Sequence, residues 1–158
     1  MGTSQSTVRP QMDEEPEKRD WNVPFAKAEE AGLIKESFQI LENAGRNGDK
    51  DAAFLLGQEY GVYAKQGWQD FEKAYHWFEI GSELGDAACT YEQGIALLKG
   101  LGVAPSHEKG LAKVIEAAEQ KNKMALEFLL SKQWQAEYEL SISTGEQEKY
   151  AHMLKELE

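Results

Sequence analysis

Beyond its polar N-terminal part, this chain carries apolar residues at helical spacing, and no stretch alternates apolar and polar residues as a half-buried strand would. Ile34, Phe38 and Leu41 stand at positions i, i+4 and i+7, which places them on one face of a helix. We expect this helix to end at Gly45 and Gly48, because helices commonly stop at glycine. The pattern predicts an all-α chain.

A helix, a loop and a second helix are predicted between residues 49 and 85. The first helix runs from about Asp49 to Tyr63. Asp70 can cap the second helix, which stops at Gly85. The apolar stripes comprise Ala52, Leu56, Gly57 and Tyr60 in the first helix, and Ala74, Tyr75, Phe78 and Gly81 in the second. These stripes predict a hairpin of two helices packed against each other.

The same plan returns further along the chain. Gly48 and Gly85 lie 37 residues apart, as do Gly57 and Gly94. The second hairpin turns through residues 99–105, where Gly100 and Gly102 can adopt the positive φ of a tight turn, and restarts behind Ser106. Its stripes comprise Cys89, Gln93, Gly94 and Leu97, followed by Gly110, Val114 and Ala117. An internal repeat of this length predicts a stack of helix pairs.

A third, degenerate unit begins near Lys121. We expect its helix to continue past Trp134 and Tyr138, and an amphipathic closing helix to follow a break at residues 141–145. The prediction is a short α-solenoid of about seven helices in antiparallel pairs. Its parts are a flexible N-terminal lead (1–24), an N-terminal capping helix (25–47), repeat 1 (48–84), repeat 2 (85–120), and a degenerate repeat 3 with a C-terminal capping helix (121–158).

Small residues recur where the predicted helices would cross. Helices approach closely only where the side chains at their crossing are small, and Gly57, Gly81 and Gly94 supply such positions. Larger neighbours such as Tyr60 and Phe78 then fill the grooves on either side. We therefore expect most of the aromatic residues in the core.

These residues support a family resemblance from about Gly48 to Lys121. The motif in the second unit comprises Gly85, Gly94, Leu97, Gly100-Leu101-Gly102-Val103 and Lys109, and the first unit reads similarly with Gly48, Ala52, Leu56-Gly57, Tyr60, Lys73-Ala74 and Trp77-Phe78. It resembles the Sel-one-like repeat family, a relative of the tetratricopeptide repeat. Two departures are Tyr63-Ala64-Lys65 in place of the Gly-x-Gly-Val turn, and Gln93 where the family prefers leucine. The resemblance implies an α-solenoid that acts as an adaptor or scaffold, usually without catalysis.

The charge of the chain narrows the choice of partner. There are 28 acidic and 17 basic residues, which gives a net charge of −11. Because nucleic acids and anionic membranes attract Lys and Arg, we expect neither as a partner. We favour a protein, and a basic protein would complement this charge. Cys89 is the only cysteine, and no apolar run approaches the roughly 18 residues of a membrane span, so a cytoplasmic location is expected.

The first six residues fit the pattern for N-myristoylation, with Gly2 as the acylated residue. A single acyl chain holds a membrane only marginally, and the acidic run at residues 13–17 opposes attachment to anionic lipids. The alternative is a plain flexible lead.

In arrays of this kind the first helix of each unit lines the concave surface, where a partner would bind. The candidate partner-binding residues lie on the helix face next to the packing stripe. They are Phe54, Gln58, Val62, Tyr91, Ile95, Leu98, Met124, Glu127 and Trp134. Their largely apolar character predicts a groove for a peptide or helix. Alternatively, the closing helix or the segment at residues 21–25 covers this surface, or a second copy of the chain does.

No catalytic, metal or cofactor motif accompanies these helices. His76, His107 and His152 belong to no zinc-binding pattern, and Gly100-Leu101-Gly102 follows a helix without the Gly-Lys-Ser of a phosphate loop. Cys89 occupies a small-residue position, which indicates a buried thiol. We therefore expect no cofactor and a non-catalytic protein-binding module. The alternatives are an immunity-type or inhibitor protein that neutralises a basic toxin or enzyme and, ranked last, a hydrolytic enzyme.

Overall fold

The computed structural model describes residues 20–158, and every regular element in that range is an α-helix, as predicted. The described residues contain nine helices, two more than the approximate count of seven. They fall into two compact units, one ending at Ile40 and the other running from Leu41 to Glu158. Gly2 and its possible acylation lie outside the described residues.

The predicted N-terminal capping helix is in fact two helices. α1 (Asn22–Glu30) ends in a turn at Gly32, which has a φ of +73° that favours glycine, and α2 (Ile34–Arg46) follows. α2 ends at Arg46, between Gly45 and Gly48, and Gly48 has a positive φ of +92°, so the predicted end of this helix is confirmed. A Cβ on Gly45 would lie 2.6 Å from Cζ3 of Trp77, so this glycine makes room for the indole.

The first predicted hairpin consists of α3 (Lys50–Tyr60) and α4 (Phe71–Glu83). The Asp49 carboxylate accepts hydrogen bonds from the backbone N–H groups of Asp51 and Ala52 at 3.0 Å, and Asp70 caps α4 as predicted. α3 ends three residues before the expected Tyr63, which leaves Val62 and Tyr63 in the turn.

The second hairpin consists of α5 (Ala87–Lys99) and α6 (His107–Glu119), with the predicted N-cap at Ser106. Gly100 and Gly102 have φ of +73° and +75°, which confirms the positive-φ turn. Gly102 also packs directly against the backbone of Phe71, where a Cβ would clash. Gly102 therefore brings the loop of the second hairpin into contact with the first hairpin, in addition to its part in the turn.

The third unit comprises α7 (Lys123–Leu130), α8 (Lys132–Glu137) and α9 (Thr144–Glu156). The prediction of one helix continuing past Trp134 is wrong, since the chain is extended at Ser131. The Ser131 hydroxyl accepts from the Trp134 N–H at 3.4 Å, while the side chain of Gln135 donates to the Leu129 carbonyl at 2.7 Å. Serine thus caps a new helix instead of continuing the old one.

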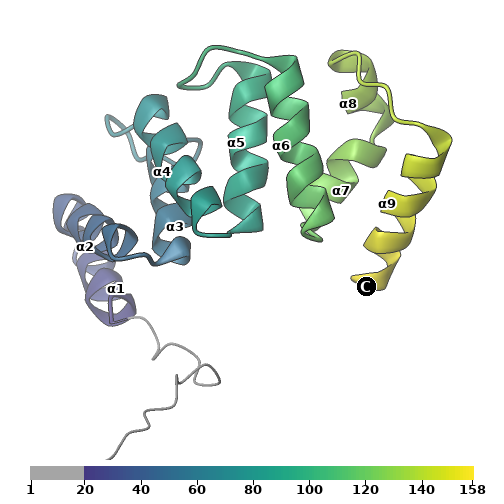
Figure 1. Ribbon diagram of the computed structural model, residues 1–158. Helices are drawn as coiled ribbons and strands as arrows, with labels where there is room; N and C mark the ends of the chain where they lie inside the picture. Colours follow the sequence, from purple (N-terminus) through teal and green to yellow (C-terminus); the bar gives the residue numbers. More distant parts are fainter. Residues whose placement is uncertain (1–19) are drawn as a thin grey trace, which may run out of the picture. The chain divides into compact units, whose positions relative to one another are not determined.

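Within the second unit, α3 to α9 follow one another as stacked hairpins (Figure 1). Each helix from α3 to α7 packs on the next, and α9 packs on α7. α5 also contacts α3 and α7, so the first helices of the three repeats form one continuous layer. This is the α-solenoid arrangement predicted from the repeat.

The crossings are formed by the predicted small residues. Gly57 packs under the Phe78 ring, Gly81 against the Cys89 sulfur, and Gly94 against Gly110 and Val114. The intervening large side chains are buried, which confirms their assignment to the core: Leu56, Tyr60, Phe78 and Leu97.

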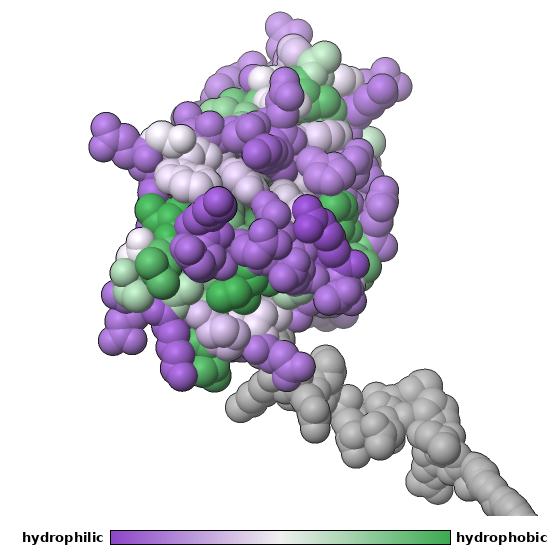
Figure 2. All heavy atoms as spheres, turned by 90° about the vertical axis from the view of Figure 1, so that its left-hand side faces the viewer, coloured by the Kyte–Doolittle hydropathy of each residue, from purple (hydrophilic) through white to green (hydrophobic). Residues whose placement is uncertain are grey.

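The molecular face in Figure 2 is mostly hydrophilic, with apolar residues in small separate groups. Such a surface is ordinary for a chain with 28% charged residues. It contrasts with the cavity described next.

Candidate functional site

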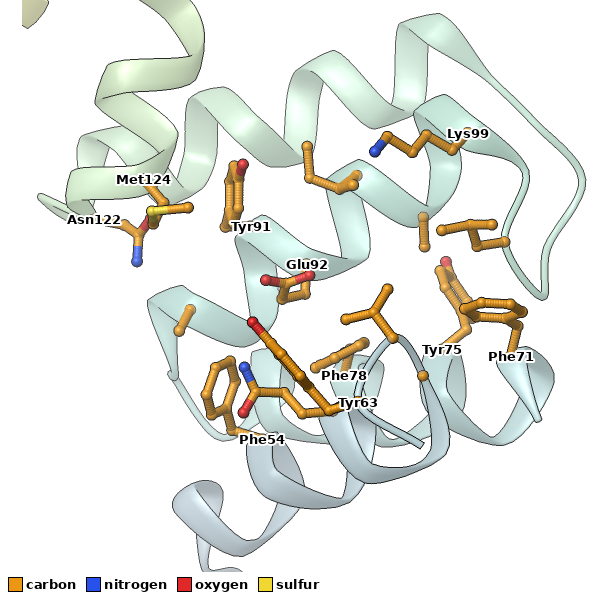
Figure 3. Close-up of a pocket in the computed structure, with 17 residues that line it drawn as sticks. Phe54, Tyr63, Phe71, Tyr75, Phe78, Tyr91, Glu92, Lys99, Asn122 and Met124 are labelled. Carbon is orange, nitrogen blue, oxygen red and sulfur yellow. The ribbon is translucent and has the colours of Figure 1, made fainter. Parts of the chain in front are cut away.

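A cavity of ≈ 340 Å³ opens between α3, α4, α5 and the start of α7 (Figure 3). Its walls are predominantly apolar. Six aromatic residues line it, from α3, the turn after α3, α4 and α5: Phe54, Tyr63, Phe71, Tyr75, Phe78 and Tyr91. The volume falls within the range of about 300–1,000 Å³ that ligand sites occupy.

Helical spacing explains why these side chains converge. Phe54 and Gln58 are one turn apart on α3, and Tyr91 and Ile95 are one turn apart on α5. The early end of α3 leaves Val62 at the mouth of the cavity. Three successive repeats therefore contribute to one site.

The structure brings together six of the nine residues predicted to bind a partner. Those six are Phe54, Gln58, Val62, Tyr91, Ile95 and Met124. Their contribution to partner binding stays a prediction.

The other three lie elsewhere. The prediction that Leu98 faces the groove is wrong: its side chain is 3% exposed, because α6 approaches closely at Gly110 and covers it. Trp134 lies on α8, where its ring stacks on Phe128 with centroids 5.2 Å apart. Glu127 pairs with Lys123 at 3.9 Å on an exposed part of α7.

Sequence reasoning missed the contribution of α4 and of two charged residues on α5. It assigned the groove to the first helix of each repeat alone, so Tyr75 of α4 was placed in the packing stripe and Phe71 was given no role. Glu92 and Lys99 also line the cavity, seven residues apart on α5. Seven residues are almost two full turns, and this spacing was the available signal that the two share a face.

Glu92 has the most unusual environment of the lining residues. It is half-buried and, among the described residues, has no hydrogen-bond or ion-pair partner. Burial raises the pKa of the Glu92 carboxyl, and the positive charge of Lys99 partly opposes that rise. Burial, aided by the charges of Glu92 and Glu127, raises the pKa of Tyr91 to about 12.

The closing helix does not cover this cavity. No residue after Met124 lines it, and α9 packs on α7 instead. Trp21 and Phe25 belong to the first compact unit, where their rings contact each other edge to face at 5.9 Å. Coverage by residues 21–25 or by a second copy stays open to experiment.

A second cavity, of ≈ 520 Å³, has Gln93 in its wall. The Gln93 side-chain N–H donates to the Tyr75 hydroxyl at 3.3 Å, but its buried carbonyl oxygen has no partner among the described residues. The repeat motif that this chain resembles has leucine at this position, and the glutamine in its place leaves a buried polar atom without a partner.

Within residues 20–158 we also considered the single cysteine, metal binding and membrane spans. Cys89 is fully buried, and burial raises the pKa of its thiol, so it is an inert core residue as interpreted from the sequence. No group of three or more His, Cys, Asp or Glu side chains in this range is placed to hold a metal ion. In the same range, no helix has the length and apolarity to cross a membrane.

Comparison with known proteins supports the fold. No family model matches the chain. Among solved structures, the crystal structure of a Sel1 repeat protein from Oxalobacter formigenes superimposes with a TM-score of 0.71 at 23% sequence identity, over 90% of this chain and 60% of that one. The chain thus spans about 60% of the length of this neighbour. It shares the fold of a Sel1 repeat protein, which confirms the resemblance read from the glycine motif of the second repeat.

Proposed function

We propose that this protein is a non-catalytic interaction module that binds a peptide or helix of a partner protein in the cavity between α3, α5 and α7. The observation that carries the proposal is the apolar rim of the cavity. Val62 and Tyr63 are each 67% exposed on one side, and Met124 is 55% exposed on the other. Grouped exposed apolar side chains mark interaction sites.

The interior of the cavity suits this role. Aromatic side chains such as Phe54 and Tyr91 offer large contact areas with few rotatable bonds to immobilise, which favours tight packing of an apolar anchor. A partner helix with apolar residues one turn apart, or an extended peptide, would enter between α3 and α5. The family resemblance supports the same function, since it implies an adaptor or scaffold.

The net charge of −11 favours one more specific alternative, an immunity-type protein that neutralises a basic toxin or enzyme. A tight one-to-one complex with one basic protein would favour it. Weak binding to many peptides would favour the general adaptor.

The test begins with co-purification of a partner from the native host and continues with measured affinities. We expect Tyr91→Ala and Ile95→Ala each to weaken the complex about tenfold or more in isothermal titration calorimetry, as central anchors do. Leu84→Ala is the matched control, because Leu84 is an exposed apolar residue outside the cavity.

Two outcomes would contradict the proposal. Unchanged affinity in both cavity variants, with a loss in Leu84→Ala, would place the partner on another surface. A dimer in analytical ultracentrifugation that dissociates on Tyr91→Ala would identify the cavity as a contact between copies of the chain.

A further inference from the structure

Glu92 projects from α5 into the middle of the cavity, with Tyr91 on one side and Phe54, Tyr63 and Phe78 on the other (Figure 3). It is the only carboxyl group among the described residues that line the cavity. A half-buried carboxylate without an ion-pair partner is costly, so its presence among aromatic side chains calls for a positively charged counterpart.

The cation available on the same helix supplies that counterpart only in part, since the charge of Lys99 lowers the pKa of Glu92 without an ion pair between the two side chains. Lys99 is about 10 Å further along α5, at a rise of roughly 1.5 Å per residue. Its Nζ lies 5.5 Å from the centroid of the Trp134 ring, which holds the ammonium group near α8. The Glu92 carboxylate therefore remains open to a charge that enters the cavity.

The walls around Glu92 are suited to a cation carried on an apolar stem. The faces of aromatic rings attract positive charge, and Phe54, Phe78 and Tyr91 are among the rings that surround the carboxylate. Lysine and arginine have aliphatic stems that pack against such rings while the charged end pairs with the carboxylate. The neutral amides of Gln58 and Asn122 add hydrogen-bonding groups without competing charge.

We propose that the partner segment inserts a lysine or arginine side chain into this cavity, where its cation pairs with Glu92, while flanking apolar residues of the segment contact Val62 and Met124. This inference rests on the proposed function and specifies the partner. The exposed apolar rim on both sides favours a side chain of a peptide over a free small cation, which would leave Val62 and Met124 bare.

The pairing predicts a pH dependence of binding. Burial raises the pKa of Glu92 in the free protein, and a paired cation would lower it. Among the described residues that line the cavity, the other titratable groups are the phenols of Tyr63, Tyr75 and Tyr91 and the ammonium of Lys99, and Glu92 is the carboxyl. Glu127 of α7 does not line the cavity, although its charge acts on Tyr91. Affinity for a basic peptide should therefore rise as pH increases through the pKa of Glu92.

The experiment is a selection from a displayed library of random 12-residue peptides, run in parallel on the full chain and on two variants. The variants are Glu92→Gln and, as a matched control, Glu148→Gln, which changes an exposed glutamate on α9. We expect Lys or Arg between apolar residues in peptides selected by the unchanged chain and by Glu148→Gln, and no such enrichment with Glu92→Gln.

A selected peptide, synthesised and labelled, then gives a double-mutant test by fluorescence anisotropy. Replacing its basic residue with norleucine should weaken binding to the unchanged chain about tenfold, and should leave binding to Glu92→Gln unaffected. Affinity for the unchanged chain should fall at acidic pH, whereas affinity for Glu92→Gln should not.

The remaining outcomes separate the two proposals. Suppose that the selected peptides lose binding on Tyr91→Ala but carry no basic residue, or are selected equally well by Glu92→Gln. This result would overturn the role of Glu92 and leave the proposed function standing. A failure to select any peptide sensitive to Tyr91→Ala would overturn both. Binding of N-acetyl-arginine amide as tightly as the peptides would identify a small cation as the ligand instead.

Discussion

Gly94 on α5 and Gly110 on α6 face each other so closely that a Cβ on Gly94 would lie 2.9 Å from the Gly110 carbonyl oxygen. Backbone cannot move aside as a flexible side chain can. We expect Gly94→Ala to lower the free energy of unfolding by about 1–3 kcal/mol, because overpacking outweighs the better helix propensity of alanine. Urea denaturation followed by circular dichroism measures this change.

Gly145→Ala provides the control for that variant. Gly145 lies in the first turn of α9 with open space around it, so the added methyl group meets nothing. Its unfolding free energy should stay level or rise by up to about 1 kcal/mol. Equal effects of the two substitutions would show that α5 and α6 are not in close contact at Gly94.

The Tyr60 hydroxyl donates a 2.7 Å hydrogen bond to the Glu42 carboxylate from a ring that is only 5% exposed. Burial and this bond raise the pKa of Tyr60. Tyr60→Ala should destabilise the protein by about 3–5 kcal/mol, and Tyr60→Phe by about 1.5–3 kcal/mol, because phenylalanine keeps the ring and loses the hydrogen bond to a charged group. Thermal unfolding measures the stability of both variants. Equally small losses of stability in the two would contradict the burial of the Tyr60 ring.

Glu92→Gln should stabilise the free protein at neutral pH. Because burial raises the folded-state pKa of Glu92, its favourable contribution is complete below the unfolded value near 4.5 and is lost as pH rises through the folded value. Glutamine carries no charge to bury, so the variant should melt at a higher temperature than the unchanged chain at pH 7. The two melting curves should converge below pH 4.5, and a gap that is independent of pH would contradict an unpaired carboxylate.

Gln93→Leu introduces the residue that the Sel-one-like repeat motif has at this position. The substitution removes a buried carbonyl oxygen without a partner in the described structure, at the loss of one 3.3 Å hydrogen bond to Tyr75. We expect the unfolding free energy to rise by about 1 kcal/mol. Destabilisation instead would indicate that an ordered water molecule satisfies the Gln93 side chain.

The regular part of the repeat could be predicted from the sequence, because each feature has a local cause. Asp70 and Ser106 cap helices and Gly100 adopts positive φ, as their residue types predict, and Gly57 and Gly94 stand at crossings, as their spacing predicts. The break at Ser131 was missed because serine is compatible with both a helix interior and an N-cap, and the Trp134 contacts on α8 depend on that choice.

The candidate site was predicted in part for a similar reason. Positions on α3 and α5 follow from helical periodicity, so Phe54, Tyr91 and Ile95 fall where expected. Whether a residue on that face is open or covered depends on the neighbouring helix. Leu98 is covered because Gly110 has no side chain, which lets α6 pack closely against it. The periodicity of apolar residues along α5 gives no information on how closely another helix approaches.

The walls of the aromatic cavity come from three successive repeats, through α3, α5 and α7. In a linear array, stability is approximately a sum of nearest-neighbour terms, and fraying can begin at either end. A partner segment bound in the cavity would contact three repeats at once, and so would add a stabilising free energy that couples repeats which are not nearest neighbours. Its arrival should therefore slow amide exchange across the central hairpins together, and convert stepwise opening of the array into a more cooperative transition.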